Sequence, residues 1–210
     1  MKQRFATVRR SALAAVAAAA TFLPILAGAQ GKAEIGKVVY DNLLSPDIDL
    51  KGGKQKNFKP KEWLELEVSM KIPAVNAEQK KAGYINEATV KWYLAFENPE
   101  GKGVMMTQKT LTHVNIPVDE EIFSSVYLSP DMVKRITGKD GGGKVAVKAV
   151  GVEVLVNGEK VGMSADKQKE GWWTAGSVSD MSTKFPLLKK DETPFAMLWY
   201  DRYAPLQKER

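Results

Sequence analysis

The sequence predicts an all-β fold, an antiparallel β-sandwich with one short helix, and three features of its 210 residues carry that prediction. Apolar residues recur at every second position in several segments, which is the period of a strand with one buried and one exposed face. The dipeptide Asn157-Gly158 separates two such segments, as the turn of a hairpin does. Only the stretch from Ser129 to Gly138 carries clear helix start and stop signals. About seven strands in one domain would account for this pattern.

The alternation is clearest in two segments, 64–72 and 88–96, and it recurs in 144–148 and 152–156. Weaker strand candidates are 35–44, 104–114 and 121–128. In the second segment the polar positions and Tyr93 fall together on the face expected to meet water. The apolar positions of the first two segments, which we expect in the core, are Leu64, Leu66, Val68, Met70, Ile72, Ala88, Val90, Trp92, Leu94 and Phe96.

The turn at Asn157-Gly158 determines how its two flanking strands meet. A type I′ turn needs positive φ at both central residues, which Asn and Gly tolerate, and its twist matches that of the strands beside it. We therefore expect residues 150–163 to form an antiparallel hairpin. This hairpin is a structural element and carries no chemistry of its own.

The expected helix lies before that hairpin. Ser129 can cap it, Pro130 suits its first position, and Gly138 can end it. The order strand, short helix, glycine-rich segment, long strand, tight turn and strand resembles one corner and the last hairpin of an immunoglobulin-like sandwich. Trp92 would be its core tryptophan. Because the chain has no cysteine, the disulfide of antibody domains is missing, and the prediction concerns architecture alone.

The first 29 residues have the three parts of a secretory signal peptide. The apolar run 11–27 follows a basic start, and Ala27-Gly28-Ala29 provides a small-x-small cleavage site. We expect Sec export with cleavage after Ala29, and the alternative is retention as an N-terminal anchor. The predicted organisation is a signal peptide at 1–29 and one sandwich domain with an aromatic C-terminal tail at 30–210. The basic residues are Lys2, Arg4, Arg9 and Arg10.

Removal of the signal changes the charge of the chain. Of 31 Lys and Arg, four lie in residues 1–29, where there is no Asp or Glu, so the remainder has 27 against 25 and a net charge of +2. A nearly neutral domain gives no reason to expect nucleic acid as a partner. The absence of cysteine excludes a lipoprotein anchor and cysteine-ligated metal. We expect a protein of the bacterial periplasm or cell envelope.

The segment 51–61 holds five lysines in eleven residues. A solvated loop between two strands is the plainest interpretation. The alternative is an electrostatic contact with acidic glycans or phospholipid head groups.

No residue pattern specifies a reaction. The segment Gly138–Lys144 satisfies G-x-x-x-x-G-K, but Val145 stands where a P-loop has Ser or Thr. We also expect this segment to follow a helix and open a strand, whereas a P-loop follows a strand and opens a helix. His113 is the only histidine, and the serines lack the G-x-S-x-G pattern of a nucleophile elbow. We therefore predict no catalytic residue, no metal, no cofactor and no bound nucleotide, and treat a two-carboxylate hydrolase as the least favoured alternative.

Two aromatic segments are the candidate partner contacts. One is Trp172-Trp173, which follows the hairpin, and the other is the tail 192–205. Both a helix and an extended strand fit the spacing of the tail, so its conformation is left open. Packing on the sandwich and contact with a partner are both compatible with its composition, because Tyr, Trp, Met and Arg are enriched at interfaces. The candidate contact residues are Trp172, Trp173, Trp199, Tyr200, Arg202 and Tyr203.

The hairpin KAVGVEVLVNGEKVG and the tail ETPFAMLWYDRYAP, behind a signal peptide, resemble a family of exported immunoglobulin-like proteins encoded beside type IV pilus components in Verrucomicrobia. The resemblance implies a sandwich, capable of oligomerisation, that serves pilus assembly or stability, and it brings no catalytic residues. The chain lacks a prepilin leader, so we do not expect a pilus subunit.

The sequence thus predicts a non-enzymatic periplasmic scaffold or interaction module. Its expected partners are envelope or pilus-assembly proteins, and a homo-oligomer is also compatible. The alternative function is a carbohydrate-binding module that stacks sugars on exposed tryptophans. A flat exposed pair at Trp172 and Trp173 would favour the sugar, and a convex exposed patch would favour a protein.

Overall fold

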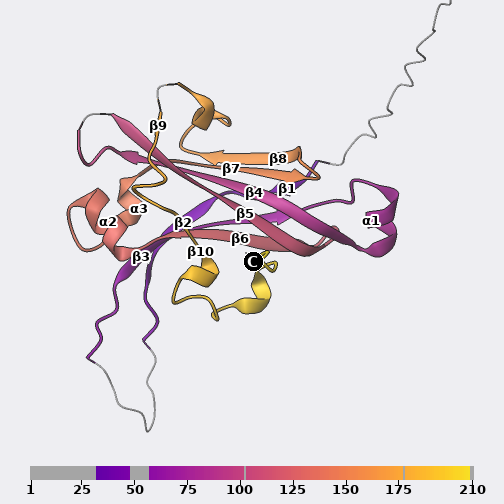
Figure 1. Ribbon diagram of the computed structural model, residues 1–210, viewed down its shortest axis with the longest axis horizontal. Helices are drawn as coiled ribbons and strands as arrows, with labels where there is room; N and C mark the ends of the chain where they lie inside the picture. Colours follow the sequence, from indigo (N-terminus) through magenta and orange to yellow (C-terminus); the bar gives the residue numbers. More distant parts are fainter. Residues whose placement is uncertain (1–31, 48–56, 102, 177, 209–210) are drawn as a thin grey trace, which may run out of the picture.

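The computed structural model describes residues 32–47, 57–101, 103–176 and 178–208. They form two five-stranded sheets packed face to face, with short helices toward the two ends (Figure 1). The predicted fold class, an all-β immunoglobulin-like antiparallel sandwich with one short helix before the penultimate hairpin, is confirmed in its sandwich architecture. The predicted signal peptide and most of the lysine-rich segment lie outside the described residues. Within the described ranges, no helix is long and apolar enough to span a bilayer.

The first sheet is built around β3, which pairs with β1, β2 and β6, while β10 extends the sheet from β6. The second has the order β8-β7-β4-β5-β9. Neighbouring strands are antiparallel except for the short parallel pair β5 and β9. The bounds in the first sheet are β1 Glu34–Ile35, β2 Val39–Leu44, β3 Glu62–Lys71, β6 Glu121–Leu128 and β10 Leu188–Lys189. Those in the second are β4 Tyr84–Glu97, β5 Val104–Pro117, β7 Val147–Val156, β8 Glu159–Asp166 and β9 Ser179–Asp180.

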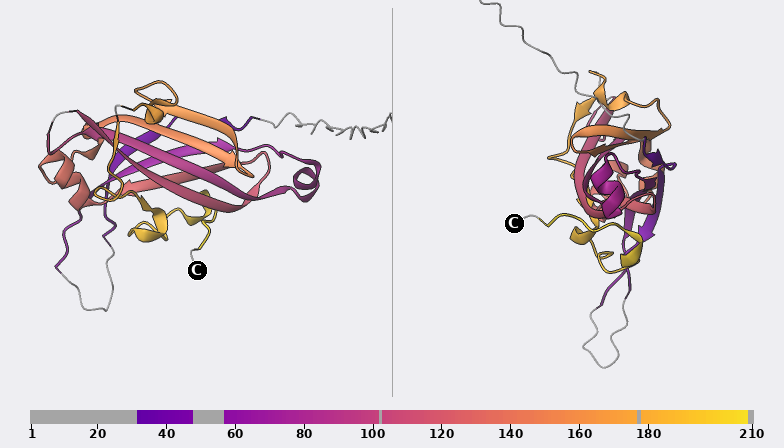
Figure 2. Two further views of the ribbon diagram at one scale, coloured as in Figure 1. Left: turned by 45° about the horizontal axis from the view of Figure 1, so that its top comes forward. Right: turned by 90° about the vertical axis from the view of Figure 1, so that its right-hand side faces the viewer.

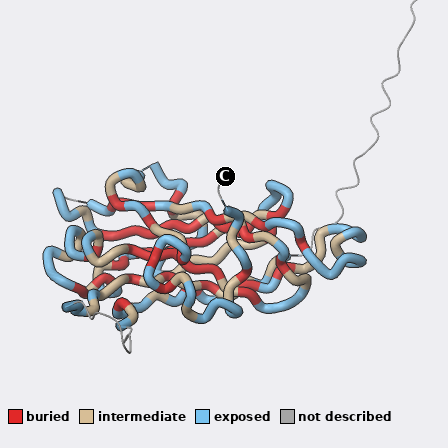
Figure 3. The backbone as a smooth tube through the Cα atoms, turned by 60° about the horizontal axis from the view of Figure 1, so that its bottom comes forward, coloured by how far each residue is buried: buried red, intermediate tan, exposed pale blue. Residues whose placement is uncertain are grey.

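The predicted core is confirmed residue by residue in β3 and β4. All ten apolar positions expected inside are buried, and Trp92 lies on the central strand of the second sheet, where its Nε1–H donates to Ser124 Oγ at 3.2 Å. Figure 3 shows buried residues along the middle of the strands and exposed ones in the loops at both ends. The segment 35–44, expected as one strand, is divided into β1 and β2.

The hairpin and its turn are also as predicted. Asn157 has φ 52° and Gly158 has φ 79°, both in the left-handed region that a type I′ turn requires. β7 and β8 pair directly across them. The predicted helix is α2 (Pro130–Thr137), which the Ser129 side chain caps at one end and Gly138, in the left-handed region, ends at the other.

Residues 144–146 correct the sequence prediction, because they belong to a short helix, α3 (Gly143–Ala146), and not to a strand. Gly141 and Gly142 have positive φ and turn the chain back toward the sandwich. A Cβ on Gly143 would stand 3.0 Å from Leu64 Cβ, a tight contact that would require the neighbouring side chains to shift. A second unpredicted helix, α1 (Ala77–Ala82), joins β3 to β4 and is capped by Asn76.

A third layer partly covers each sheet, which the alternation did not predict. Tyr93 points outward from β4 but is buried, because Trp173 stacks on its ring. On the opposite side, the C-terminal tail lies against the outer face of β3 and β6 (Figure 2). Figure 1 shows the segment around Trp173 in orange and the tail in yellow on opposite sides of the sandwich.

Candidate interaction surface

The tail forms neither of the two conformations considered from the sequence. It is a series of turns with two single-turn 3-10 helices, Lys190–Glu192 and Tyr200–Arg202. Each turn is held by short-range backbone hydrogen bonds, such as that from Leu198 N–H to the Phe195 carbonyl at 3.0 Å. Neither of the two alternatives left open from the sequence describes the tail, because its turns follow the surface beneath it and not one regular period.

Phe195 is the apolar anchor of the tail. Its ring is buried and stacks on Tyr127 of β6, with centroids 5.5 Å apart, and it meets Trp63 of β3 edge-on at 5.7 Å. Aromatic pairs at these distances add stability beyond the area that they bury. The tail is therefore attached to the first sheet through a packed aromatic cluster.

Glu67 is the polar anchor. It lies on the outer face of β3, and its carboxylate accepts two hydrogen bonds from Arg202, from Nη2 at 2.7 Å and from Nε at 3.3 Å, and a third from the Tyr203 hydroxyl. The Arg202 guanidinium also lies 3.6 Å from the centroid of the Phe123 ring. A bidentate arginine stacked on an aromatic ring has a fixed orientation, so this contact positions the second half of the tail.

Lys190 organises the loop between these anchors. The residue is largely buried, and its Nζ donates hydrogen bonds to the carbonyl oxygens of Leu198 and Ala196. Burial lowers the pKa of Lys190, and the nearby Glu65 carboxylate raises it. Burial in turn raises the pKa of Glu65, although a hydrogen bond from Tyr127 opposes that effect. A buried ammonium that binds two loop carbonyls keeps the loop in one shape.

The loop displays an exposed apolar tip, which we define as Met197, Trp199 and Tyr200. Their exposed fractions are 80%, 54% and 64%. Trp199 has φ 50°, a left-handed conformation that is uncommon for a bulky side chain. Such a conformation persists only where the surrounding structure holds it, and it recurs at functional sites. The tip is thus a group of three exposed large apolar side chains on a loop that hydrogen bonds from Lys190 hold in place.

The six predicted contact residues divide into three groups. Trp199 and Tyr200 are exposed in the tip, whereas Arg202 and Tyr203 are engaged by Glu67 and support it. Trp172 and Trp173 lie on the second sheet, away from the other four. Sequence reasoning gave no site role to Glu67 and Lys190, because opposite charges on a strand and on a distant tail carry no signal that they will meet.

Trp172 and Trp173 do not form a flat exposed platform. Trp173 is buried against Tyr93, with ring centroids 4.7 Å apart and an interplanar angle of 5°. Trp172 stands at 82° to Trp173. Among the described residues, neither buried indole nitrogen has a hydrogen-bond partner. A sugar needs an accessible aromatic face, so this arrangement gives the carbohydrate alternative no support.

His113 has a structural environment. Its Nδ1–H donates to the Ala204 carbonyl at 3.0 Å, which leaves Nε2 to accept from the Ser124 hydroxyl at 2.9 Å. Ser124 Oγ in turn accepts from Trp92 Nε1. Both His113 and Ser124 are buried, and burial lowers the pKa of His113 to about 4. No carboxylate takes part in this chain of hydrogen bonds, which joins β4, β5, β6 and the tail.

The glycine-rich segment does not offer a phosphate site. The Gly142 N–H donates to the Glu62 carboxylate at 2.5 Å, so an acidic side chain already occupies that position. The segment leads into the four-residue helix α3, whereas we expected it to open a strand directly. Among the described residues, no three metal-ligating side chains are grouped as a metal site requires.

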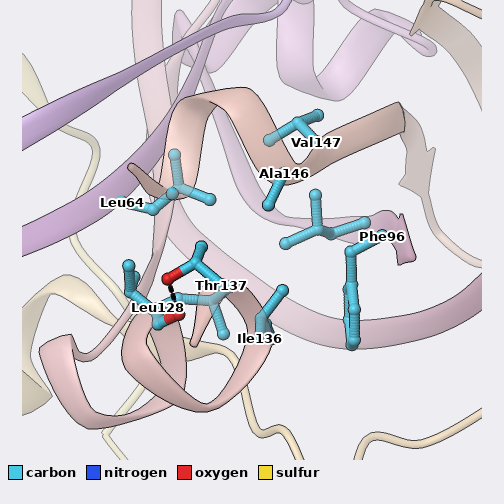
Figure 4. Close-up of a pocket in the computed structure, with 10 residues that line it drawn as sticks. Leu64, Phe96, Leu128, Ile136, Thr137, Ala146 and Val147 are labelled. Carbon is cyan, nitrogen blue, oxygen red and sulfur yellow. Dashed lines mark hydrogen bonds between the residues drawn. The ribbon is translucent and has the colours of Figure 1, made fainter. Parts of the chain in front are cut away.

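Two of the cavities are relevant here. One lies under α2 and α3 and measures about 10 Å³, enough for a single water molecule, so it is a packing void in the core (Figure 4). The other, of about 290 Å³, lies where the tail meets β5, and its lining includes Leu111, Tyr203 and Leu206. Met197 and Tyr200 of the tip lie on its wall.

Comparison with known proteins agrees with this fold. A protein-family model matches residues 25–210. Among solved structures, a crystal structure of a protein from Akkermansia muciniphila is 38% identical, with a TM-score of 0.78 over 85% of this chain and 94% of that chain. No curated protein matches.

Proposed function

This chain belongs to the family whose model spans residues 25–210 and is a relative of the Akkermansia muciniphila protein, and on that premise we propose that it is a non-enzymatic interaction module of the cell envelope. The observation that carries the proposal is the exposed tip of Met197, Trp199 and Tyr200 on its ordered support. Aromatic residues that remain exposed on a rigid surface are typical anchors of protein interfaces.

The finer part of the proposal is a role in the assembly or stability of type IV pili. It is supported by the resemblance of the hairpin and tail motifs to proteins encoded with pilus components, and the predicted export signal is compatible with that location. The partner is then an envelope or pilus-assembly protein that contacts the tip. The tail fits this role because its anchors hold the tip without using its aromatic faces.

The test is a double substitution, Trp199→Ala with Tyr200→Ala, compared with Tyr84→Ala with Val145→Ala. The control residues are also exposed, at 56% and 83%, and belong to β4 and α3, outside the tail. We expect the tip variant to lose crosslinked envelope proteins that wild type and control both capture, while its melting temperature stays within about 2 °C of theirs. Equal capture by both variants would remove the tip from consideration.

A further inference from the structure

Met197 of the tip is the most accessible sulfur in the part of the chain that the structure describes. Of the eight methionines in the sequence, seven lie in the described ranges, and Met197 is exposed at 80%. Three of the others are buried and three are partly exposed. The buried ones are Met70, Met105 and Met106, and the partly exposed ones are Met132, Met163 and Met181. Because the sequence contains no cysteine, no thiol of this chain competes with Met197 for an oxidant.

Lys190 holds the backbone on both sides of Met197. Its Nζ donates to the Ala196 carbonyl at 3.4 Å and also to the Leu198 carbonyl. The Leu198 N–H donates in turn to the carbonyl of Phe195, whose ring is buried. The chain is therefore fixed before and after Met197, while the side chain itself is exposed. A chemical change confined to that side chain alters the surface of the tip and leaves its support in place.

The Met197 side chain contributes to two adjoining apolar surfaces. It forms the tip with Trp199 and Tyr200, and it lines the cavity of about 290 Å³ together with Tyr200 and Leu206. A thioether adapts its shape to apolar partners, which makes methionine common at binding surfaces. Oxidation to the sulfoxide replaces it with a polar, chiral group. A partner that covered the sulfoxide oxygen would have to remove its water, which weakens an apolar contact.

We propose that Met197 is a site of reversible oxidation by peroxides and that its sulfoxide weakens the contact of the tip with its partner. The sulfur lone pair attacks one oxygen of hydrogen peroxide, the S–O bond forms, the O–O bond breaks and water leaves, so sulfur loses two electrons and the peroxide gains them. In the return step, two thiols of a sulfoxide reductase become a disulfide, water leaves and the thioether is restored. The weakened contact rests on the proposed function, whereas the oxidation does not.

Exposure favours both steps at Met197. A buried sulfur meets peroxide only when the surrounding structure opens, and that opening costs free energy. The reductase must likewise reach the sulfoxide, which an exposed side chain permits. A bound partner that covers the tip should in turn protect Met197 from peroxide.

The first test is a peptide mass map of the purified protein after brief exposure to dilute hydrogen peroxide. We expect Met197 to gain one oxygen at least about tenfold faster than the three buried methionines, which react only through local opening. Fragment spectra separate Met197 from Trp199. Two methionine sulfoxide reductases of opposite stereospecificity, with dithiothreitol, should remove the oxygen. Oxidation of Met197 no faster than that of Met70, or a sulfoxide that the reductases leave in place, overturns the proposal.

The second test compares Met197→Leu with Met163→Leu, since leucine nearly conserves the volume of methionine. Met163 lies on β8, outside the tail. After peroxide, wild type and Met163→Leu should elute earlier from a hydrophobic-interaction column, and Met197→Leu should not shift. The melting temperatures should stay within about 2 °C of those of the untreated proteins. An equal shift in Met197→Leu and wild type, or no shift in wild type, contradicts the proposal.

Capture of envelope proteins separates this inference from the proposed function. Peroxide should reduce capture by wild type and Met163→Leu about fivefold or more and leave capture by Met197→Leu unchanged. Undiminished capture by oxidised wild type overturns the effect on the partner. If Trp199→Ala with Tyr200→Ala captures as much as wild type, the proposed function and that effect fail together, and the mass map alone decides the oxidation of Met197.

Discussion

The segment around Trp173 and the C-terminal tail cover opposite outer faces of the same sandwich, and they do so by different chemistry. Trp173 packs by ring stacking, and its indole nitrogen finds no hydrogen-bond partner in the part of the chain that the structure describes. The tail combines one buried ring, Phe195, with charged hydrogen bonds from Arg202 and Lys190. The first attachment is non-directional, whereas the second fixes orientation, so only the tail holds side chains exposed in a defined arrangement.

Phe195→Ala should have the largest effect, because it removes the apolar anchor of the tail. Loss of a fully buried phenylalanine costs about 3–5 kcal/mol. We expect chemical denaturation to show that loss, with protease cleavage after Arg202 as the sign that the tail has detached. Tyr200→Ala, which removes an exposed ring from the same segment, should change stability by less than about 0.5 kcal/mol. A Phe195→Ala protein as stable as wild type would mean that the polar anchor alone holds the tail.

Acid should weaken the tail side through His113. Its pKa falls from 6.5 to about 4 on folding, so the neutral ring stabilises the fold above pH 6.5, and this contribution is lost as the pH falls toward 4. The full shift corresponds to about 3 kcal/mol. The raised pKa of Glu65 acts in the opposite sense, so the informative quantity is the difference between wild type and His113→Gln. We expect the unfolding free energy to fall more between pH 7.5 and pH 4.5 in wild type than in His113→Gln. An equal fall in the two proteins would show that folding does not lower the pKa of His113.

Gly151→Ala should disturb only the opposite face. A Cβ there would stand 2.1 Å from the Trp173 ring, so the ring must move from Tyr93. We expect a loss of about 1–3 kcal/mol and a red shift of tryptophan emission. Gly176→Ala is the control in the same segment, because its Cβ meets nothing within 4 Å. Capture by the tip should survive both substitutions, and its loss in Gly151→Ala would show that the two faces are coupled.

The parts predicted well from the sequence are those in which local chemistry decides the structure. Alternation in β3 and β4, the Asn157-Gly158 turn and the caps of α2 each act over a few residues, and all were found as expected. The tail was not predictable, because Phe195 and Arg202 are positioned by residues far away in the sequence. Tyr93 shows the same limit, since nothing near it indicates that Trp173 will cover its outer face.

The contacts of the tail also affect the order in which the fold can be completed. Residues 203–207 bridge β6 and β5, with Ala204 bound by His113, so these residues close the side of the sandwich between the two strands. A polypeptide synthesised with its N-terminus first lacks this closure until residues 203–207 have been made. Until these residues dock, β5 and β6 lack their bridge, so this side of the domain becomes compact late in folding.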